Sequence, residues 1–292
     1  GYIEDPNMLY FERGYGLEYG ITDLDYKKKG ANVVSERKAR ILEVMCQPKF
    51  CEADIGHIVE EQTVFGWLHL GQGSREARVL SEKSVTAIEW ELMYMGKKQV
   101  FKRNSRLTGR IGVLHAFAYA GKIPEECRVA VIGRGEVSKG AIKQLTDIKV
   151  SDIDVYHSKN IHLLRKRISE YDVIVHCACS YDVIIHENEL ARMKRNALFI
   201  HMGSDSIEGK FEAQSIFSPL DWVNKGKNPM YCIDHVPTLA FQTASKYISR
   251  DVAPYIDMLI KGKMNKTLRD AIVIDKGRPN PDRLEHEIIS FG

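Results

Sequence analysis

The stretch from Arg128 to Leu145 joins an apolar strand-like run, two closely spaced glycines and a helical run. In a dinucleotide-binding turn the first glycine makes the tight bend, and the second lets backbone amides approach the pyrophosphate. Gly133 and Gly135 suit these two places, and Ser138 takes the third place, where a small residue lets helix and strand pack closely. The pattern predicts a nucleotide-binding βαβ unit with the phosphates at the helix N-terminus. The residues expected to contact the cofactor are Gly133, Arg134, Gly135, Glu136, Val137 and Ser138.

The next strand-like run, residues 151–160, bears on which dinucleotide binds. Enzymes that use NAD usually carry Asp or Glu about 20 residues after the glycines, where it binds the ribose 2′-hydroxyl. Here Asp154 lies inside the run, and His157, Ser158 and Lys159 follow it. A hydroxyl and a cation suit a 2′-phosphate, and Arg134 supplies a second cation. We therefore expect NADP (NADPH) rather than NAD; the alternative interpretation is a plain polar loop.

Strand-like and helical runs alternate along most of the chain, which indicates an α/β fold. Residues 104–124 predict a long helix, with apolar positions at helical spacing and a glycine and a proline at its end. The run AIVIDKGRPNP near the C-terminus indicates a hairpin or an edge strand. We expect two Rossmann-like domains with parallel sheets and an active-site cleft between them. These are a catalytic domain of residues 1–103 plus 232–292 and a Rossmann NADP-binding domain of residues 104–231.

Composition excludes several classes of function. The 42 Lys and Arg residues nearly balance 39 Asp and Glu, so the net charge of +3 gives no general attraction to nucleic acid or to anionic membranes. No run of 18 apolar residues predicts a membrane span. The six cysteines lack the paired spacing of a zinc site, so we expect no metal. Without a recognisable secretory signal they indicate reduced thiols and a cytoplasmic protein.

Three side chains follow strand-like runs, at the sheet edge where α/β proteins build their sites. His69 ends VFGWLHL, Lys49 follows the run that ends in Gln47-Pro48, and Asp205 follows FIHMG. Imidazole titrates near neutral pH, and a lysine can hold a substrate carboxylate. The alternatives are a structural histidine and a solvated surface lysine.

The chain resembles the alanine dehydrogenase/transhydrogenase superfamily and, within it, the N5-(carboxyethyl)ornithine synthase branch. The resemblance covers nearly all of the chain and rests on blocks that occur in the same order: FERGYGLEYGITDLDYKKKGANVVS, ILEVMCQPKF, TVFGWLHL, the helix from Asn104, GKIPEECRVAVIGRGEVSKGA and YCIDHVPTLAFQTASKYIS.

The resemblance implies an NADP-dependent enzyme that reductively joins pyruvate to the side-chain amine of ornithine or lysine. It places the catalytic histidine on His69 and the active-site aspartate on Asp205. The keto-acid lysine of alanine dehydrogenases would fall on Cys46, so that correspondence fails, and the synthase branch instead places the lysine on Lys49. The loop after the last Rossmann strand falls on residues 234–237, with His235 near the cofactor. A homo-oligomer is also implied.

Two other functions stay open: an amino-acid dehydrogenase that uses ammonia, and an NADP-binding protein without catalysis. The superfamily opens with a strand and an arginine that holds the substrate carboxylate, and this sequence enters after that segment. We therefore expect about 30 further residues upstream, one βα unit that supplies this arginine. The alternative is that Arg103, Arg106 or Arg110 takes the role.

Overall fold

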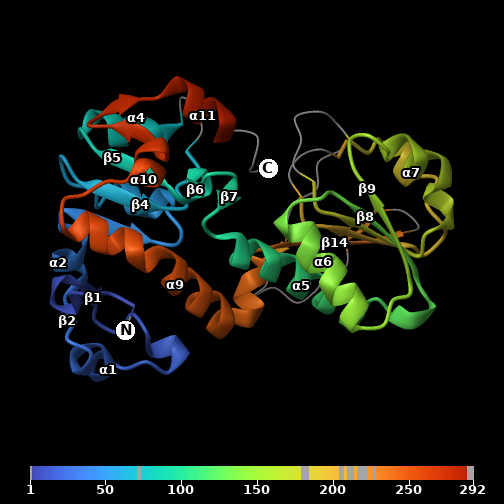
Figure 1. Ribbon diagram of the computed structural model, residues 1–292, viewed down its shortest axis with the longest axis horizontal. Coiled ribbons are helices and arrows are strands. Elements are labelled where there is room, and N and C mark those ends of the chain that lie inside the picture. Colours follow the sequence, from blue (N-terminus) through green and yellow to red (C-terminus); the bar gives the residue numbers. More distant parts are fainter. Residues whose placement is uncertain are drawn as a thin grey trace. The chain divides into compact units, whose positions relative to one another are not determined.

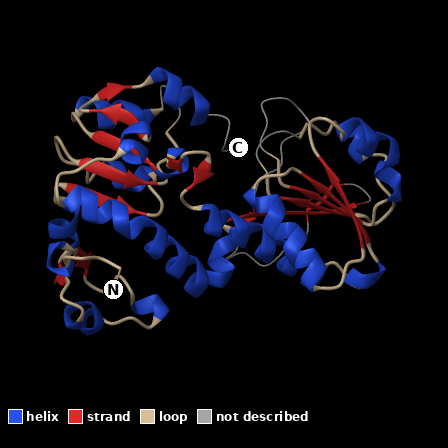
Figure 2. Ribbon diagram, viewed as in Figure 1, coloured by secondary structure: helices blue, strands red, loops and turns tan. Residues whose placement is uncertain are grey.

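The computed structural model describes residues 2–70, 74–178, 184–203, 207–208, 214–215, 223–225 and 228–287. Two compact units divide the chain: residues 1–101 with 246–288, and residues 102–245 (Figure 1). Both are α/β units in which parallel strands alternate with helices, as the sequence predicts (Figure 2). The chain returns to the first unit within a long helix, at residue 246.

The first unit is built on a five-stranded sheet of order β16-β15-β5-β4-β3. Strands β3, β4 and β5 are parallel, whereas β15 and β16 form an antiparallel hairpin beside β5, as the C-terminal pattern indicates (Figure 1). The strands are β3 (Val44–Gln47), β4 (Thr63–Gly66), β5 (Thr86–Glu89), β15 (Ile272–Asp275) and β16 (Arg278–Pro279). The helices are α2 (Glu36–Arg40), α3 (Glu52–Ile55), α4 (Arg75–Glu82), α9 (Phe241–Ile260, which begins in the second unit), α10 (Lys266–Asp270) and α11 (Pro281–Glu287), with the 3₁₀ turn η3 (Trp90–Leu92).

Two small sheets complete this unit. Strand β1 pairs with β2 in parallel, and β6 pairs with β7 in an antiparallel hairpin. Helix α1 lies between β1 and β2 in the chain and starts at Asp23, because Thr22 and Asp25 form a capping box. The bounds are η1 (Pro6–Met8), β1 (Tyr10–Glu12), η2 (Leu17–Tyr19), α1 (Asp23–Lys28), β2 (Asn32–Val34), β6 (Tyr94–Met95) and β7 (Lys98–Gln99).

Alternating side chains of the first sheet fill two cores. Val64 and Ala87 face the core that helix α4 covers, whereas Phe65 and Ile88 face the core that includes Val252 of α9. All four strand residues are fully buried. The period of two along each strand therefore fixes the register and the position of the strand ends.

The second unit is a seven-stranded sheet of order β12-β14-β11-β10-β8-β9, with β13 antiparallel to β14. The strands are β8 (Arg128–Ile132), β9 (Asp152–Tyr156), β10 (Val173–His176), β11 (Leu198–His201), β12 (Gln214–Ser215), β13 (Val223–Lys225) and β14 (Asn228–Asp234). The helices are α5 (Lys102–Tyr119), η4 (Pro124–Glu126), α6 (Glu136–Asp147), α7 (Ile161–Arg167), η5 (Ile168–Glu170), α8 (Glu187–Leu190) and η6 (Val236–Ala240). The strand order reverses between β8 and β10, which is where a doubly wound sheet binds its ligand.

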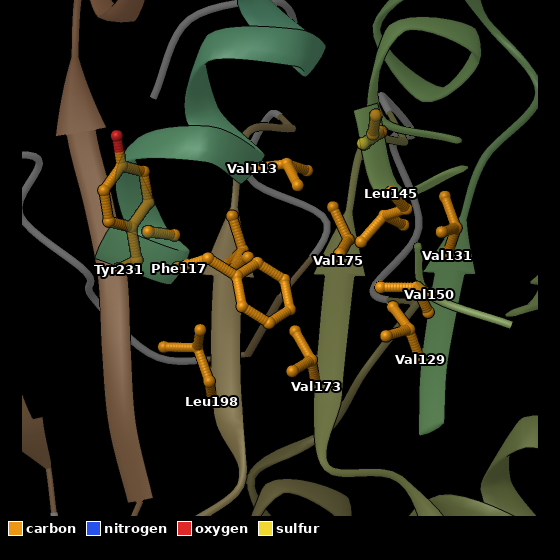
Figure 3. Close-up of a cluster of buried hydrophobic side chains, with 14 of the residues drawn as sticks. Val113, Phe117, Val129, Val131, Leu145, Val150, Val173, Val175, Leu198 and Tyr231 are labelled. Atoms are coloured by element: carbon orange, nitrogen blue, oxygen red, sulfur yellow. The ribbon is translucent and has the colours of Figure 1, made fainter. Parts of the chain in front are cut away.

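Helices cover both faces of this second sheet. Val129, Val131 and Val173 lie under α5 and α6 in one core, into which Val113 and Phe117 of α5 point (Figure 3). Ala130 and Ile132 face the opposite core, which includes α7. A near-continuous apolar strand such as β8 is expected where a parallel strand is buried on both faces.

Candidate active site

The glycine turn after β8 has the geometry that a dinucleotide turn requires. Gly133 has φ of +119°, and an added Cβ would lie 3.1 Å from the backbone of Cys177, so a side chain would be strained here. Ser138 is buried and its hydroxyl donates to the carbonyl oxygen of Gly133 over 2.7 Å, which fixes the turn from the first turn of α6. The serine at the third place therefore contributes a hydrogen bond as well as small size.

The N-terminus of α6 has room for an anion. Gly135 is the N-cap and makes no side-chain cap, and nothing lies within 4 Å of where its Cβ would be. The first-turn amides of a helix attract phosphate through their N–H groups and the helix dipole. This open cradle fits the pyrophosphate of a dinucleotide.

Glu136 begins α6 and would repel phosphate if its charge were unpaired. Burial raises the pKa of Glu136, but hydrogen bonds from Lys139 and Arg106 outweigh burial, so the pKa is lowered overall. Lys139 donates over 2.6 Å, and Arg106 reaches from α5. These two cations compensate the carboxylate, which leaves the helix dipole to act on the ligand.

Helix α6 is held against α5 by an unusually close crossing. An added Cβ on Gly109 would lie 1.9 Å from the carbonyl oxygen of Val137, and one on Gly140 would lie 2.0 Å from that of Arg106. Only glycine permits such backbone approach. The crossing therefore sets the position of the glycine turn, and the glycines of α5 were not recognised from the sequence as part of it.

The end of β9 is electropositive. Arg134, Ser158 and Lys159 are exposed, and His157 is half-buried. Desolvation and the nearby positive charges of Arg134 and Lys159 lower the pKa of His157, which places these three groups close together. The Asn160 side chain accepts from the His157 amide over 2.7 Å and so shapes the turn. A basic turn of this kind suits a 2′-phosphate.

Asp154 takes no part in that turn. A hydrogen bond from the Tyr171 hydroxyl lowers the pKa of Asp154, and its carboxylate also pairs with Arg128 over 3.2 Å and Arg167 over 3.6 Å. Residues 155–160 contain no Asp or Glu. The carboxylate of β9 is thus engaged in a structural network away from the strand end.

Two buried histidines lie at the strand ends next to the glycine turn, and the sequence analysis missed them. His176 ends β10 and His201 ends β11, with their Nδ1 atoms 3.1 Å apart. An added Cβ on Gly203 would lie 2.5 Å from the His176 ring. In the sequence each of the two histidines ends an apolar run, VIVH or LFIH, and this shared position could have indicated the pair.

In the first unit, Lys49 and His69 follow neighbouring parallel strands. Gln47 of β3 pairs with Gly66 of β4, so the two strands end at the same level. Just beyond, the amide of Phe50 donates to the carbonyl oxygen of Trp67 over 3.1 Å and joins the two loops. The structure therefore brings the loops of Lys49, which is exposed, and His69, which is half-buried, to one edge of the sheet.

The turn that carries His69 is tightly constrained. His69 has φ of +51°, in the left-handed region, and its neighbours Leu68 and Leu70 are buried in the core. The amides of Leu68 and His69 both donate to Oε2 of Glu89, over 2.8 and 3.1 Å. Glu89 ends β5 and is fully buried. Sequence analysis did not recognise this carboxylate, which is 20 residues from His69.

The remaining predicted site residues stand as follows. His235 is exposed, has φ of +56° and precedes η6 at the end of β14. Asp205 lies outside the described residues. Among the residues that the structure describes, no group of three or more His, Cys, Asp or Glu side chains could hold a metal ion. No described helix is long and apolar enough to cross a membrane.

Comparisons with known proteins bear on the whole chain. Residues 2–105 match the family "Alanine dehydrogenase/PNT, N-terminal domain". A curated N(5)-(carboxyethyl)ornithine synthase from Lactococcus lactis subsp. lactis is 28% identical over 271 residues, covering 84% of each chain. Another synthase of that name from Clostridium botulinum is 24% identical over 86% of this chain and 85% of its own. The structure of an L-alanine dehydrogenase superposes with a TM-score of 0.80 at 17% identity, covering 96% of this chain and 90% of the other.

These matches confirm the resemblance to the superfamily and its synthase branch, and the structural match confirms the Rossmann-type fold. Together with the glycine turn, they support an oxidoreductase with a pyridine-nucleotide-binding fold.

Proposed function

We propose that the chain catalyses the NADPH-dependent reductive condensation of pyruvate with the side-chain amine of ornithine, or of lysine, to give a carboxyethyl amino acid. One observation carries the proposal: a lysine and a histidine occupy joined loops at the carboxyl edge of β3 and β4. Relatives that match most of this chain bear the synthase name. The nucleotide unit offers a cradle for the reductant.

In the proposed mechanism, the Lys49 ammonium pairs with the carboxylate and carbonyl oxygen of pyruvate, as a flexible point charge can. The substrate amine attacks the keto carbon, and His69 removes a proton from that nitrogen. His69 passes that proton to the former carbonyl oxygen, which gives a carbinolamine. After taking up a further proton from solvent, His69 protonates the hydroxyl group, which leaves as water and gives a protonated imine. NADPH, when held by the turn of Gly133 and Gly135, would supply the hydride that converts the protonated imine to the secondary amine. Asp205 is assigned by resemblance alone, to the nicotinamide ribose or the cationic amine.

NADPH is proposed over NADH because of the charge at the end of β9. Arg134, His157 and Lys159 lie together there, with the Ser158 hydroxyl beside them. The nearest strand carboxylate, Asp154, is already paired with arginines. We place the 2′-phosphate at this turn and the pyrophosphate between Gly133 and Val137, with His235 near the cofactor.

Two alternatives remain testable. An amino-acid dehydrogenase would use ammonia, as the alanine dehydrogenase match suggests, and an NADP-binding protein would bind without turnover. We further propose a cytoplasmic homo-oligomer that acts on small molecules.

NADPH oxidation measured with pyruvate and each of ornithine, lysine and ammonia separates these functions. The proposal expects the highest kcat/KM with ornithine or lysine as the amine. Turnover with ammonia alone would favour the dehydrogenase, and NADPH binding without turnover on any amine would favour the third function.

A further inference from the structure

We infer that Glu89 is a positioning residue for His69: its buried carboxylate holds the turn that presents the imidazole to the substrate. The inference rests on the proposed function for its kinetic consequences, but not for the contact itself. Glu89 lies at the end of β5, on the strand that pairs with β4. The two residues are 20 positions apart, so they belong to no common local sequence motif.

The burial of Glu89 requires strong hydrogen bonding. A carboxylate without partners is very costly in a protein interior. Glu89 is 0% exposed, and its Oε2 accepts from the amides of Leu68 and His69, while Oε1 accepts from that of Glu91 over 3.4 Å. The backbone of Glu89 is fixed in turn, because its amide donates to the carbonyl oxygen of Ala271 over 2.9 Å. The carboxylate thus belongs to a strand whose backbone is held in the sheet, and it accepts hydrogen bonds from the turn.

The turn needs this carboxylate to keep its conformation. His69 adopts left-handed backbone geometry, which a side chain with a Cβ rarely takes unless its surroundings impose it. Two successive amides converge on one oxygen, an arrangement that an anion stabilises. Leu68 is 2% exposed and Leu70 is 0% exposed, so the turn is anchored on both sides of His69. These constraints together fix where the imidazole can lie.

A carboxylate serves this purpose better than an amide. Charge-assisted hydrogen bonds are stronger than neutral ones. One carboxylate oxygen accepts hydrogen bonds from both amides, and an ionised carboxyl group has no donor of its own to oppose an amide N–H. In Glu89→Gln, one oxygen can still accept from the turn, but the side-chain NH₂ must face the Glu91 amide or the turn itself. The turn should therefore persist with weaker hydrogen bonds and a less defined His69.

The test combines kinetics with an NMR measurement that does not need activity. In Glu89→Gln, kcat should fall about tenfold to a hundredfold, as for a small misplacement of a catalytic group, while the Kd for NADPH stays within about twofold. In protein labelled with ¹⁵N-Leu and ¹⁵N-His, the amide protons of Leu68 and His69 should move upfield as the bond to the carboxylate is lost. Glu89→Asp, which keeps the charge, should recover part of kcat.

Gln62→Met is the matched control. Gln62 is also buried in this unit, and its side chain donates to the carbonyl oxygens of Arg40 and Leu42 over 2.8 and 2.7 Å. The control should lose stability and keep kcat. Equal losses of kcat in Gln62→Met and Glu89→Gln would show that Glu89 has only a structural role. An unchanged kcat in Glu89→Gln would contradict the positioning role as well. Unchanged amide shifts would overturn the contact. If the wild type turns over no amine, the proposed function fails, and the amide shifts alone decide whether Glu89 holds the turn.

Discussion

Acidification should destabilise the nucleotide unit through His176. This imidazole is fully buried at the end of β10, and its ring lies beside those of Phe199 and His201. Burial, aided by the neighbouring His201, lowers the pKa of His176 from 6.5 to about 3. Between those values the folded chain keeps His176 neutral, whereas the unfolded chain binds a proton. Because the unfolded state binds more protons, stability falls as the pH falls through this window and is fully present above pH 6.5.

The size of the effect follows from that pKa difference. Each pKa unit corresponds to about 1.4 kcal/mol, so His176 should contribute a loss of about 2.5 kcal/mol between about pH 7.5 and pH 4.5. This loss is a large share of the free energy of unfolding of a typical domain. It should therefore be measurable in urea unfolding followed by far-ultraviolet circular dichroism.

His176→Gln removes the titrating group and keeps a hydrogen-bonding side chain. The difference in unfolding free energy between wild type and this variant should shrink by about 2.5 kcal/mol on acidification, because only the wild type has His176 to protonate. His162→Gln, at an exposed position of α7, is the matched control, and its difference from wild type should stay constant. A His176→Gln difference that does not change with pH would refute the reasoning.

Three further predictions concern the candidate site. Gly109→Ala places a methyl group 1.9 Å from the Val137 carbonyl oxygen, so it should destabilise the chain by about 1–3 kcal/mol and weaken NADPH binding. Gly56→Ala is the control: nothing lies within 4 Å of the added methyl group, so it should change neither stability nor NADPH binding. NADPH should bind about ten- to a hundredfold tighter than NADH, and Lys159→Ala should reduce that ratio; equal Kd values in calorimetry would contradict the 2′-phosphate site. His69→Ala should lower kcat about a hundred- to ten-thousandfold and leave the Kd for NADPH unchanged, and a variant within about threefold of wild-type kcat would make His69 structural.

The sequence predicted the parts of the fold that local chemistry determines. The turn of Gly133 and Gly135, the long helix expected over residues 104–124 and found over Lys102–Tyr119, and the C-terminal hairpin each depend on residues close together in the chain. Such features have their own signals, since a capping residue or a glycine acts on its immediate neighbours.

The parts that escaped prediction depend on contacts between distant segments. Nothing near Glu89 indicates that it accepts hydrogen bonds from the His69 turn, because the contact forms only when β5 pairs with β4. Gly109 likewise appears as an ordinary helical glycine until α6 is packed against it. His176 and His201 meet because β10 and β11 pair in register. Strand pairing and helix packing, rather than composition, determine these three features.

Transfer of deuterium tests the central claim most directly. The protein is incubated with pyruvate, ornithine and NADPH deuterated at the transferred position, and the products are identified by mass spectrometry. The account predicts a carboxyethylornithine that carries one deuterium in its carboxyethyl group, formed in equal amount to the NADP⁺ produced. Deuterium found in alanine when ammonia replaces ornithine, with no condensed product from ornithine or lysine, would contradict it.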